Sequence, residues 1–248
     1  IGRYFAMKKR KLFCARSLLN NIEFNITTYM IESFVSGAMY HVDTFISQGK
    51  IEHEFVVKYT KNPVHLMNCD VGGIVQMVDN PLIRAIKAVN HQVLKSLCPP
   101  DGCTHAEYFL TPQNDIYFCE IGARFGGTYI VTTIEAVSGI NYAQKWLLNE
   151  LGLPYEQKNS ISPCAGYLDI PAPEMVYITK VSEASSVYPW VIAEEIKTHY
   201  GEIFQVRQKI NNRIASYAIT GNNEKEIENH ISILLNAKLI TWEALSNA

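Results

Sequence analysis

Two glutamates thirteen residues apart, Glu107 and Glu120, lie in short apolar runs that predict an antiparallel hairpin over His105–Ile121. With a four-residue loop at Pro112–Asp115, Glu107 falls directly opposite Glu120, and Cβ atoms at opposed positions lie about 4.5–5.5 Å apart. Two carboxylates in that arrangement repel each other unless a cation lies between them. Mg²⁺ binds one or two carboxylates together with phosphate oxygens and water. The pair therefore predicts a Mg²⁺ (or Mn²⁺) site for a phosphate-bearing ligand.

The residues around this pair suit an anionic ligand. Strand alternation places His105 and Phe118 on the face that carries the two glutamates. If the second strand continues, Arg124 shares that face, and its guanidinium suits bidentate contact with a phosphate or a carboxylate. Gly126 and Gly127 would allow backbone N–H groups to approach an anion closely. Surface glutamates, a glycine turn and a core histidine would each explain one residue, so the interpretation rests on their occurrence together.

The surrounding pattern predicts an α+β chain with an antiparallel centre rather than a doubly wound parallel sheet. Strands at Met39–Ile46 and Ile51–Tyr59 are joined by a glycine-containing hairpin turn. Asn80–Pro81 begins a helix that runs to Leu97 with a 3.6-residue apolar period. Further strands are expected at Tyr29–Val35, Ala165–Ile170, Val176–Val181, Glu202–Gln208 and Arg213–Thr220, and further helices at Tyr129–Val137, Asn141–Leu151, Pro189–Tyr200 and from Asn223.

Composition excludes several classes of protein. The 248 residues are 48% hydrophobic and 19% charged with a formal net charge of -2, which excludes a disordered chain. The near-neutral charge gives no broad basic surface, so no nucleic-acid partner is expected. No run of about 18 apolar residues occurs, so no membrane partner is expected either. The six cysteines include no CxxC pair, which favours free thiols and a cytoplasmic location. Because the chain begins with Ile1, we expect a fragment or a processed product.

The hairpin and its neighbours resemble a known superfamily. Glu120–Gly127 reads Glu-Ile-Gly-Ala-Arg-Phe-Gly-Gly, and together with Glu107 it resembles the ATP-grasp superfamily, closest to the carboxylate–amine ligases that include L-amino-acid ligases. Tyr29–Asp43 resembles the interdomain strand of that family, and Glu135–Asn141 resembles its helix-connecting signature. The resemblance covers roughly Tyr29 to Leu153 in its motifs.

The resemblance implies a role for each residue of the hairpin. Glu107 and Glu120 would be metal ligands for Mg²⁺ (or Mn²⁺). Arg124 would be a catalytic residue that contacts the acyl phosphate or the substrate carboxylate, and His105 is a second catalytic candidate. Gly126 and Gly127 would bind substrate.

The resemblance also implies an ATP site. Glu32 would accept a hydrogen bond from the adenine amino group, and the backbone of Val35 would pair with a ring nitrogen. Lys58 would extend from a loop toward the γ-phosphate. Two of these residues have structural alternatives, since Glu32 could cap an exposed strand end and Lys58 could be a charge that protects an edge strand.

The implied activity is that of an ADP-forming carboxylate–amine ligase that uses ATP to join small-molecule carboxylate and amine substrates, such as amino acids or dipeptides. Residues 1–70 would be the remaining part of the small ATP-grasp subdomain with the interdomain strand, 71–160 the core with the metal site, and 161–248 a C-terminal α+β flank. The 14 tyrosines fit a homodimer interface or an ordinary half-buried sheet equally well.

Three departures from the family pattern leave alternatives open. Met39 stands where many relatives have a ribose-binding Glu, and Gly122 where several have an Asn metal ligand. Nothing before Tyr29 resembles the Gly-rich phosphate loop or the N-terminal substrate domain, so we expect this fragment alone to be inactive. A non-catalytic remnant that serves as a regulatory or partner-binding module is one alternative. A relative that carboxylates or phosphorylates small molecules is another.

Overall fold

The computed structural model describes residues 4–7, 11–14, 32–63, 69–171, 175–205 and 213–245. Its largest sheet contains β4 (Ala38–Ser47), β5 (Lys50–Tyr59), β6 (Val71–Val75), β7 (Gly102–Leu110), β8 (Ile116–Gly122), β9 (Cys164–Pro171), β11 (Val191–Ile196) and β13 (Arg213–Gly221). Two smaller sheets contain β1 (Tyr4–Met7), β2 (Lys11–Cys14) and β3 (Glu32–Ser33), and β10 (Met175–Val181), β12 (Ile203–Gln205) and β14 (Ile240–Ala244). The helices are α2 (Pro81–Leu97), α3 (Ile130–Ser138), α4 (Tyr142–Glu150) and α5 (Glu224–Asn236).

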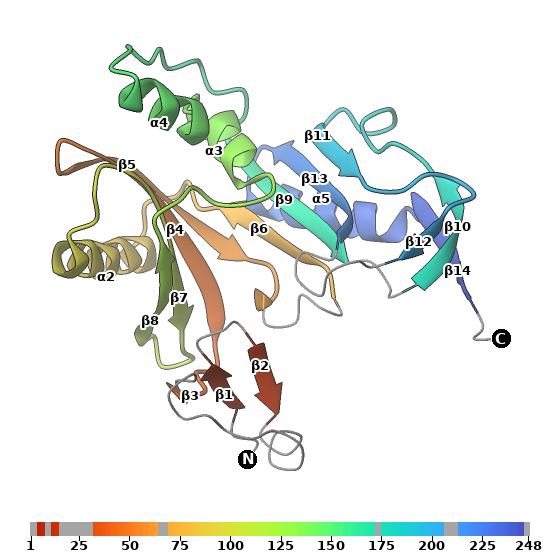
Figure 1. The fold of residues 1–248 in the computed structure, drawn as a ribbon, viewed down its shortest axis with the longest axis horizontal. Helices are drawn as coiled ribbons and strands as arrows, with labels where there is room; N and C mark the ends of the chain where they lie inside the picture. The colour runs from red at the N-terminus through yellow and green to blue at the C-terminus, as the bar shows by residue number, and fades with distance from the viewer. Residues whose placement is uncertain are drawn as a thin grey trace.

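The eight strands of the large sheet follow the order β11-β13-β9-β6-β5-β4-β7-β8 (Figure 1). Every neighbouring pair is antiparallel. The prediction of an α+β chain with an antiparallel centre is therefore confirmed. Strands from all three predicted segments hydrogen-bond within this one sheet, so the boundaries at 70/71 and 160/161 do not separate sheets.

The β4–β5 hairpin shows how local sequence sets this sheet. Gln48 and Gly49 both have positive φ, 52° and 69°, as a tight hairpin turn with the twist of the flanking strands requires. The Asp101 carboxylate accepts hydrogen bonds from both backbone N–H groups, at 2.6 and 2.9 Å. The turn thus fixes the pairing of the two strands that form the centre of the site.

Helices α2 and α5 each begin directly after an asparagine that caps the first turn. Asn80 Oδ1 accepts the N–H of Ile83 at 3.0 Å ahead of α2, and Asn223 Oδ1 accepts the N–H of Glu226 at 3.0 Å ahead of α5. Both starts were predicted from the sequence and are confirmed. No described helix combines the length and the apolar character needed to cross a bilayer.

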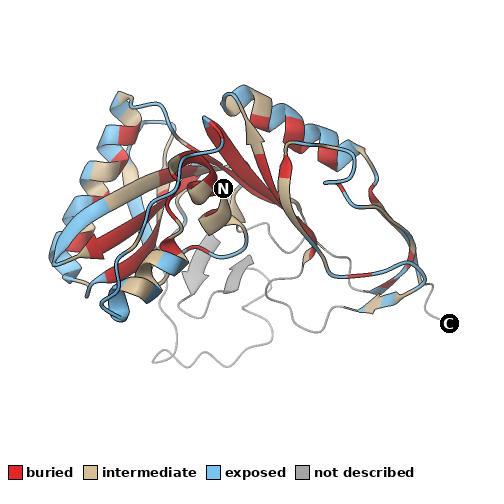
Figure 2. Cartoon of the chain, turned by 90° about the horizontal axis from the view of Figure 1, so that it is seen from above, coloured by how far each residue is buried: buried red, intermediate tan, exposed pale blue. Residues whose placement is uncertain are grey.

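Helices cover both faces of the large sheet. Strand alternation divides its side chains between the faces, and the most buried positions lie along its central strands (Figure 2). On one face, α2 packs against one end of the sheet and α5 packs against the other end, each through an apolar cluster. The opposite face carries the cluster of α3, whose Ile130 and Ile134 pack with Phe45, Val57 and Tyr167. We call this second face the α3 face.

Residues 189–200 form a different structure from the one predicted. The predicted helix Pro189–Tyr200 is wrong, because Val191–Ile196 forms β11, an edge strand paired with β13. Ile192 and Ile196 are four residues apart, a spacing that also fits one face of a helix, but β-branched residues favour the pleated surface that β13 offers. Strands β1, β2, β6 and β14 were not predicted. Of the predicted strand Tyr29–Val35, residues 29–31 lie outside the described part of the chain, as do residues 206–208 of the predicted strand Glu202–Gln208.

Candidate metal and phosphate site

The β7–β8 hairpin places the two predicted metal ligands opposite each other. Glu107 and Glu120 are direct partners in the strand register, as the sequence predicted. The register shifts by one residue beyond them, because Cys119 forms a bulge and Tyr108 pairs with Phe118. The predicted position of Phe118 on the glutamate face is therefore wrong: its ring lies 5.9 Å from that of Tyr108, centroid to centroid, on the α2 side of the sheet.

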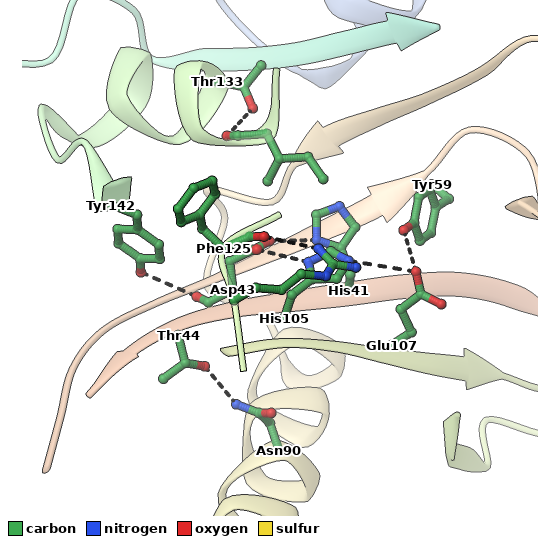
Figure 3. Close-up of polar contacts among 12 residues, drawn as sticks. His41, Asp43, Thr44, Tyr59, Asn90, His105, Glu107, Phe125, Thr133 and Tyr142 are labelled. Atoms are coloured by element: carbon green, nitrogen blue, oxygen red, sulfur yellow. Dashed lines mark hydrogen bonds and ion pairs between the residues drawn. The ribbon is translucent and has the colours of Figure 1, made fainter. Parts of the chain in front are cut away.

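A polar network lies beside Glu107 on the α3 face (Figure 3). The Asp43 carboxylate binds two histidines, with Oδ2 2.6 Å from His41 Nδ1 and Oδ1 2.9 Å from His105 Nδ1. His105 Nε2 lies 3.7 Å from Glu107 Oε1. The Tyr59 hydroxyl donates to that same oxygen at 2.7 Å. Three adjacent strands, β5, β4 and β7, supply these five residues.

Burial and charge shift the pKa of every member of the network. Burial alone would raise the pKa of Asp43, but His105 and His41 hold it well below its usual range. Burial alone would lower the pKa of His105, but the Asp43 carboxylate and Glu107 raise it to about 9. The pKa of His41 is lowered, because its complete burial outweighs Asp43. Despite its burial, Glu107 has a lowered pKa, because the nearby His105 imidazole and the hydrogen bond from Tyr59 favour the ionised carboxylate. At neutral pH the network therefore holds an ionised Asp43, a protonated His105 and an ionised Glu107.

The loop after β8 closes over this network. β8 ends at Gly122, so Arg124 lies in a bend rather than in a continued strand as expected. Its Nη1 donates to the backbone oxygen of Phe125 at 3.0 Å. A Cβ on Gly126 would lie 2.9 Å from Asp43 Oδ1 and 2.6 Å from Ile130 Cγ2, so only glycine allows this approach.

Gly127 differs from Gly126 in its surroundings. Apart from its two chain neighbours, no described residue has a heavy atom within 4 Å of the position that a Gly127 Cβ would take. Its backbone is exposed at the turn into α3, where a ligand can approach it.

The C-terminal strands also reach this loop. Thr128, which has a φ of 52°, donates from Oγ1 to Asp169 Oδ2 at 3.2 Å. Arg213 Nη1 donates to the same carboxylate oxygen at 3.1 Å and to Thr128 Oγ1. Burial raises the pKa of Asp169, and Arg213 opposes that shift. Residues of β9 and β13 thus hold the loop that follows the metal-site hairpin.

The predicted ATP-site residues are not gathered around Glu107 and Glu120 in the same way. Lys58 lies within β5 opposite Tyr40, and Tyr40 packs in the α2 cluster. Lys58 is therefore in a strand rather than a loop and points to the face opposite Glu107, which corrects its predicted approach to the γ-phosphate at this site.

Glu32 and Val35 lie before β4, outside the large sheet. Glu32 forms β3 and pairs with Ala6 of β1, while its side chain is outside the described part of the structure. Val35 is half-buried in the loop between β3 and β4. Their contacts with adenine stay predictions.

His41, Asp43 and Tyr59 were not predicted as site residues from the sequence. A usable signal was present: His41 and Asp43 occupy alternate positions of a largely apolar strand, so both must point to the same face. Both side chains are fully buried, and buried polar groups require partners. The partner, His105, is separated by 62 residues in sequence and is found only from the strand pairing.

The donor set fits a divalent cation. Both contacts of Glu107 with described residues involve Oε1, while Oε2 forms no hydrogen bond to a described residue. The ligand atoms of His41, Asp43 and His105 also lie within 4.8 Å of one another. There each Asp43 oxygen already binds an imidazole, so this trio is arranged as a hydrogen-bonded group. The opposed glutamates are the better oxygen site for Mg²⁺.

No family model matches the chain. The chain is similar to an L-arginine-specific L-amino acid ligase of Bacillus subtilis, with 20% identity over 229 residues that cover 90% of this chain and 54% of that protein. It superimposes on the crystal structure of an L-amino acid ligase from Bacillus licheniformis with a TM-score of 0.76 and 18% identity, over 99% of this chain and 64% of that one. The chain has the ATP-grasp fold.

A further ATP-grasp structure was determined with nucleotide. It is a carboxyaminoimidazole ribonucleotide synthase from Aspergillus clavatus complexed with ATP, which matches with a TM-score of 0.62 and 15% identity over 95% of this chain and 62% of that one. The chain spans about half the length of the curated relative and less than two thirds of each of these two structures.

Proposed function

We propose that the chain is part of an ATP-dependent, ADP-forming carboxylate–amine ligase, and that Glu107 and Glu120 hold its divalent cation. The observation that carries the proposal is the direct opposition of these two carboxylates across β7 and β8. Two carboxylates opposed in this way can bind one hard cation together. The ATP-grasp fold supports a nucleotide as the phosphate-bearing ligand.

In the proposed reaction the substrate carboxylate attacks the γ-phosphate of ATP and releases ADP, which gives an acyl phosphate. The amine then attacks the acyl carbon, and inorganic phosphate leaves as the amide forms. Glu107 and Glu120 would hold a magnesium ion, which would neutralise charge on the transferring phosphoryl group.

The protein contributes positioning and electrostatics to this chemistry. Arg124, which packs over Gly122 beside the hairpin, supplies a guanidinium for the acyl phosphate or the substrate carboxylate. The exposed backbone at Gly127 supplies N–H groups for the same anion. The names of the relatives support amino acids as substrates.

The decisive experiment replaces one glutamate without changing its shape. We expect Glu120→Gln to abolish Mn²⁺-dependent ATP binding by the 248-residue chain, measured by calorimetry, because one of two opposed carboxylates is lost. The matched control is Glu228→Gln on α5, which removes the same charge from a helix that packs on the other face. Unchanged Mn²⁺–ATP affinity in Glu120→Gln would reject the site.

A further inference from the structure

We propose that Asp43, His105 and Tyr59 form a positioning relay that orients the Glu107 carboxylate toward the cation. The relay rests on the metal site of the proposed function and assigns roles to residues that do not themselves touch the metal. Each link is a contact between side chains on the α3 face of three neighbouring strands (Figure 3).

The first link holds Glu107 from two sides. Tyr59 donates to Oε1 at 2.7 Å, and His105 Nε2 faces the same oxygen at 3.7 Å. Since both contacts fall on Oε1, the other oxygen, Oε2, is left without a hydrogen bond to any described residue. A carboxylate held through one oxygen has lost rotational freedom before a cation arrives.

The second link holds His105. Its Nδ1 lies 2.9 Å from Asp43 Oδ1, and the two residues are direct partners in the β4–β7 register. His105 is 4% exposed and Asp43 is fully buried, so neither can relax into water. A histidine bound to a buried carboxylate through one nitrogen presents its other nitrogen in a fixed direction, which here is toward Glu107.

The third link holds Asp43 itself. His41 Nδ1 binds Oδ2 at 2.6 Å, and Gly126 closes over Oδ1. The carboxylate that orients His105 is thus fixed by its own strand and by the loop that carries Arg124. Partners of this kind around a metal ligand typically change metal affinity by 10–100-fold when they are removed.

The cleanest variant is Tyr59→Phe, because it removes only one hydroxyl. We expect it to weaken binding of Mn²⁺ alone, followed by electron paramagnetic resonance of the free ion, by roughly 10-fold. Its matched control is Tyr108→Phe, which removes a hydrogen bond of the same 2.7 Å length, to Asn90, on the opposite face of the sheet. The control should change the melting temperature without changing Mn²⁺ affinity. Equal Mn²⁺ affinities in the wild type and Tyr59→Phe would overturn the relay.

A double-mutant cycle tests whether Asp43 acts through His105. We expect Asp43→Asn and His105→Gln each to weaken Mn²⁺ binding, and the double variant to bind as weakly as His105→Gln alone. Fold-losses that multiply would show that Asp43 acts independently and would overturn the relay. If Asp43→Asn does not fold, the Tyr59→Phe comparison still decides.

Glu120→Gln separates failure of the relay from failure of the proposed function. Loss of Mn²⁺ binding in Glu120→Gln together with wild-type affinity in the relay variants overturns the relay alone. Wild-type affinity in Glu120→Gln rejects the metal site itself. If binding survives in Glu120→Gln but is lost in Asp43→Asn, the cation lies at the histidine–aspartate trio, and both assignments are wrong.

Discussion

At the scale of single residues, the site depends on how closely backbone and side chains approach one another. Gly126 and Gly127 are neighbours in sequence and were predicted together as substrate-binding glycines. The structure separates them: Gly126 lies against Asp43 and Ile130, whereas Gly127 faces open space. A motif of two glycines therefore combines a packing requirement with an exposed backbone position.

This difference predicts opposite effects of the same substitution. Gly126→Ala should destabilise the protein by about 1–3 kcal/mol, because the new methyl group would overlap Asp43 Oδ1 and Ile130. Gly127→Ala should leave the free energy of unfolding within about 1 kcal/mol of the wild type, since its methyl group would meet nothing. Urea denaturation of both variants measures the effect. Equal losses in the two variants would contradict the close contact described for Gly126.

At the scale of elements, the loop between β8 and α3 is held from the C-terminal strands. Asp169 of β9 and Arg213 of β13 both contact Thr128, and both are largely buried, with side-chain exposures of 8% and 15%. No site residue was predicted within residues 161–248. Their contribution could not be predicted, because Thr128 and Arg213 are 85 residues apart and meet only through the strand order.

Removal of Arg213 should destabilise the protein, because the buried Asp169 carboxylate would lose its cationic partner. Arg213→Gln should lower the free energy of unfolding by about 3 kcal/mol at pH 7. Burial already raises the pKa of Asp169, and loss of Arg213 should raise it further. The folded state then binds more protons than the unfolded state as pH rises from about 4, so stability should fall with rising pH. Denaturation at pH 4.5 and 7 checks this, and an equal loss at both values would contradict it.

Sequence patterns predicted most elements near the site correctly. They failed where the structure of a segment depends on the strand that pairs with it. The β4–β5 hairpin, the β7–β8 hairpin and α2 were predicted because turn and cap residues mark them locally. The segment 189–200 was assigned to the wrong structure, because its apolar spacing fits a helix until β13 pairs with it. Phe118 was assigned to the wrong face, because a one-residue bulge reverses the direction of a side chain. Lys58 was expected in a loop, but it lies within β5.

At the scale of the whole molecule, the proposed activity is defined by its products. We expect the ligase that contains this chain to release ADP and phosphate from ATP in equal amounts, and only when a carboxylate and an amine substrate are both present. Chromatography of reactions with amino acids, compared with bicarbonate in place of the carboxylate, identifies the bond formed. A carboxylated or phosphorylated product without an amide would reject the ligase in favour of another ATP-grasp reaction.

The position of β9 has a consequence for any attempt to divide the chain. β9 lies between β6 and β13 in the middle of the sheet, although it begins at Cys164, after the predicted boundary at 160/161. A polypeptide cut at that boundary would leave the ladder edge of β6, including Gly72 and Gly73, unpaired in water. Such an open edge recruits strands from other molecules, so the shortened polypeptide should aggregate rather than fold as an independent unit.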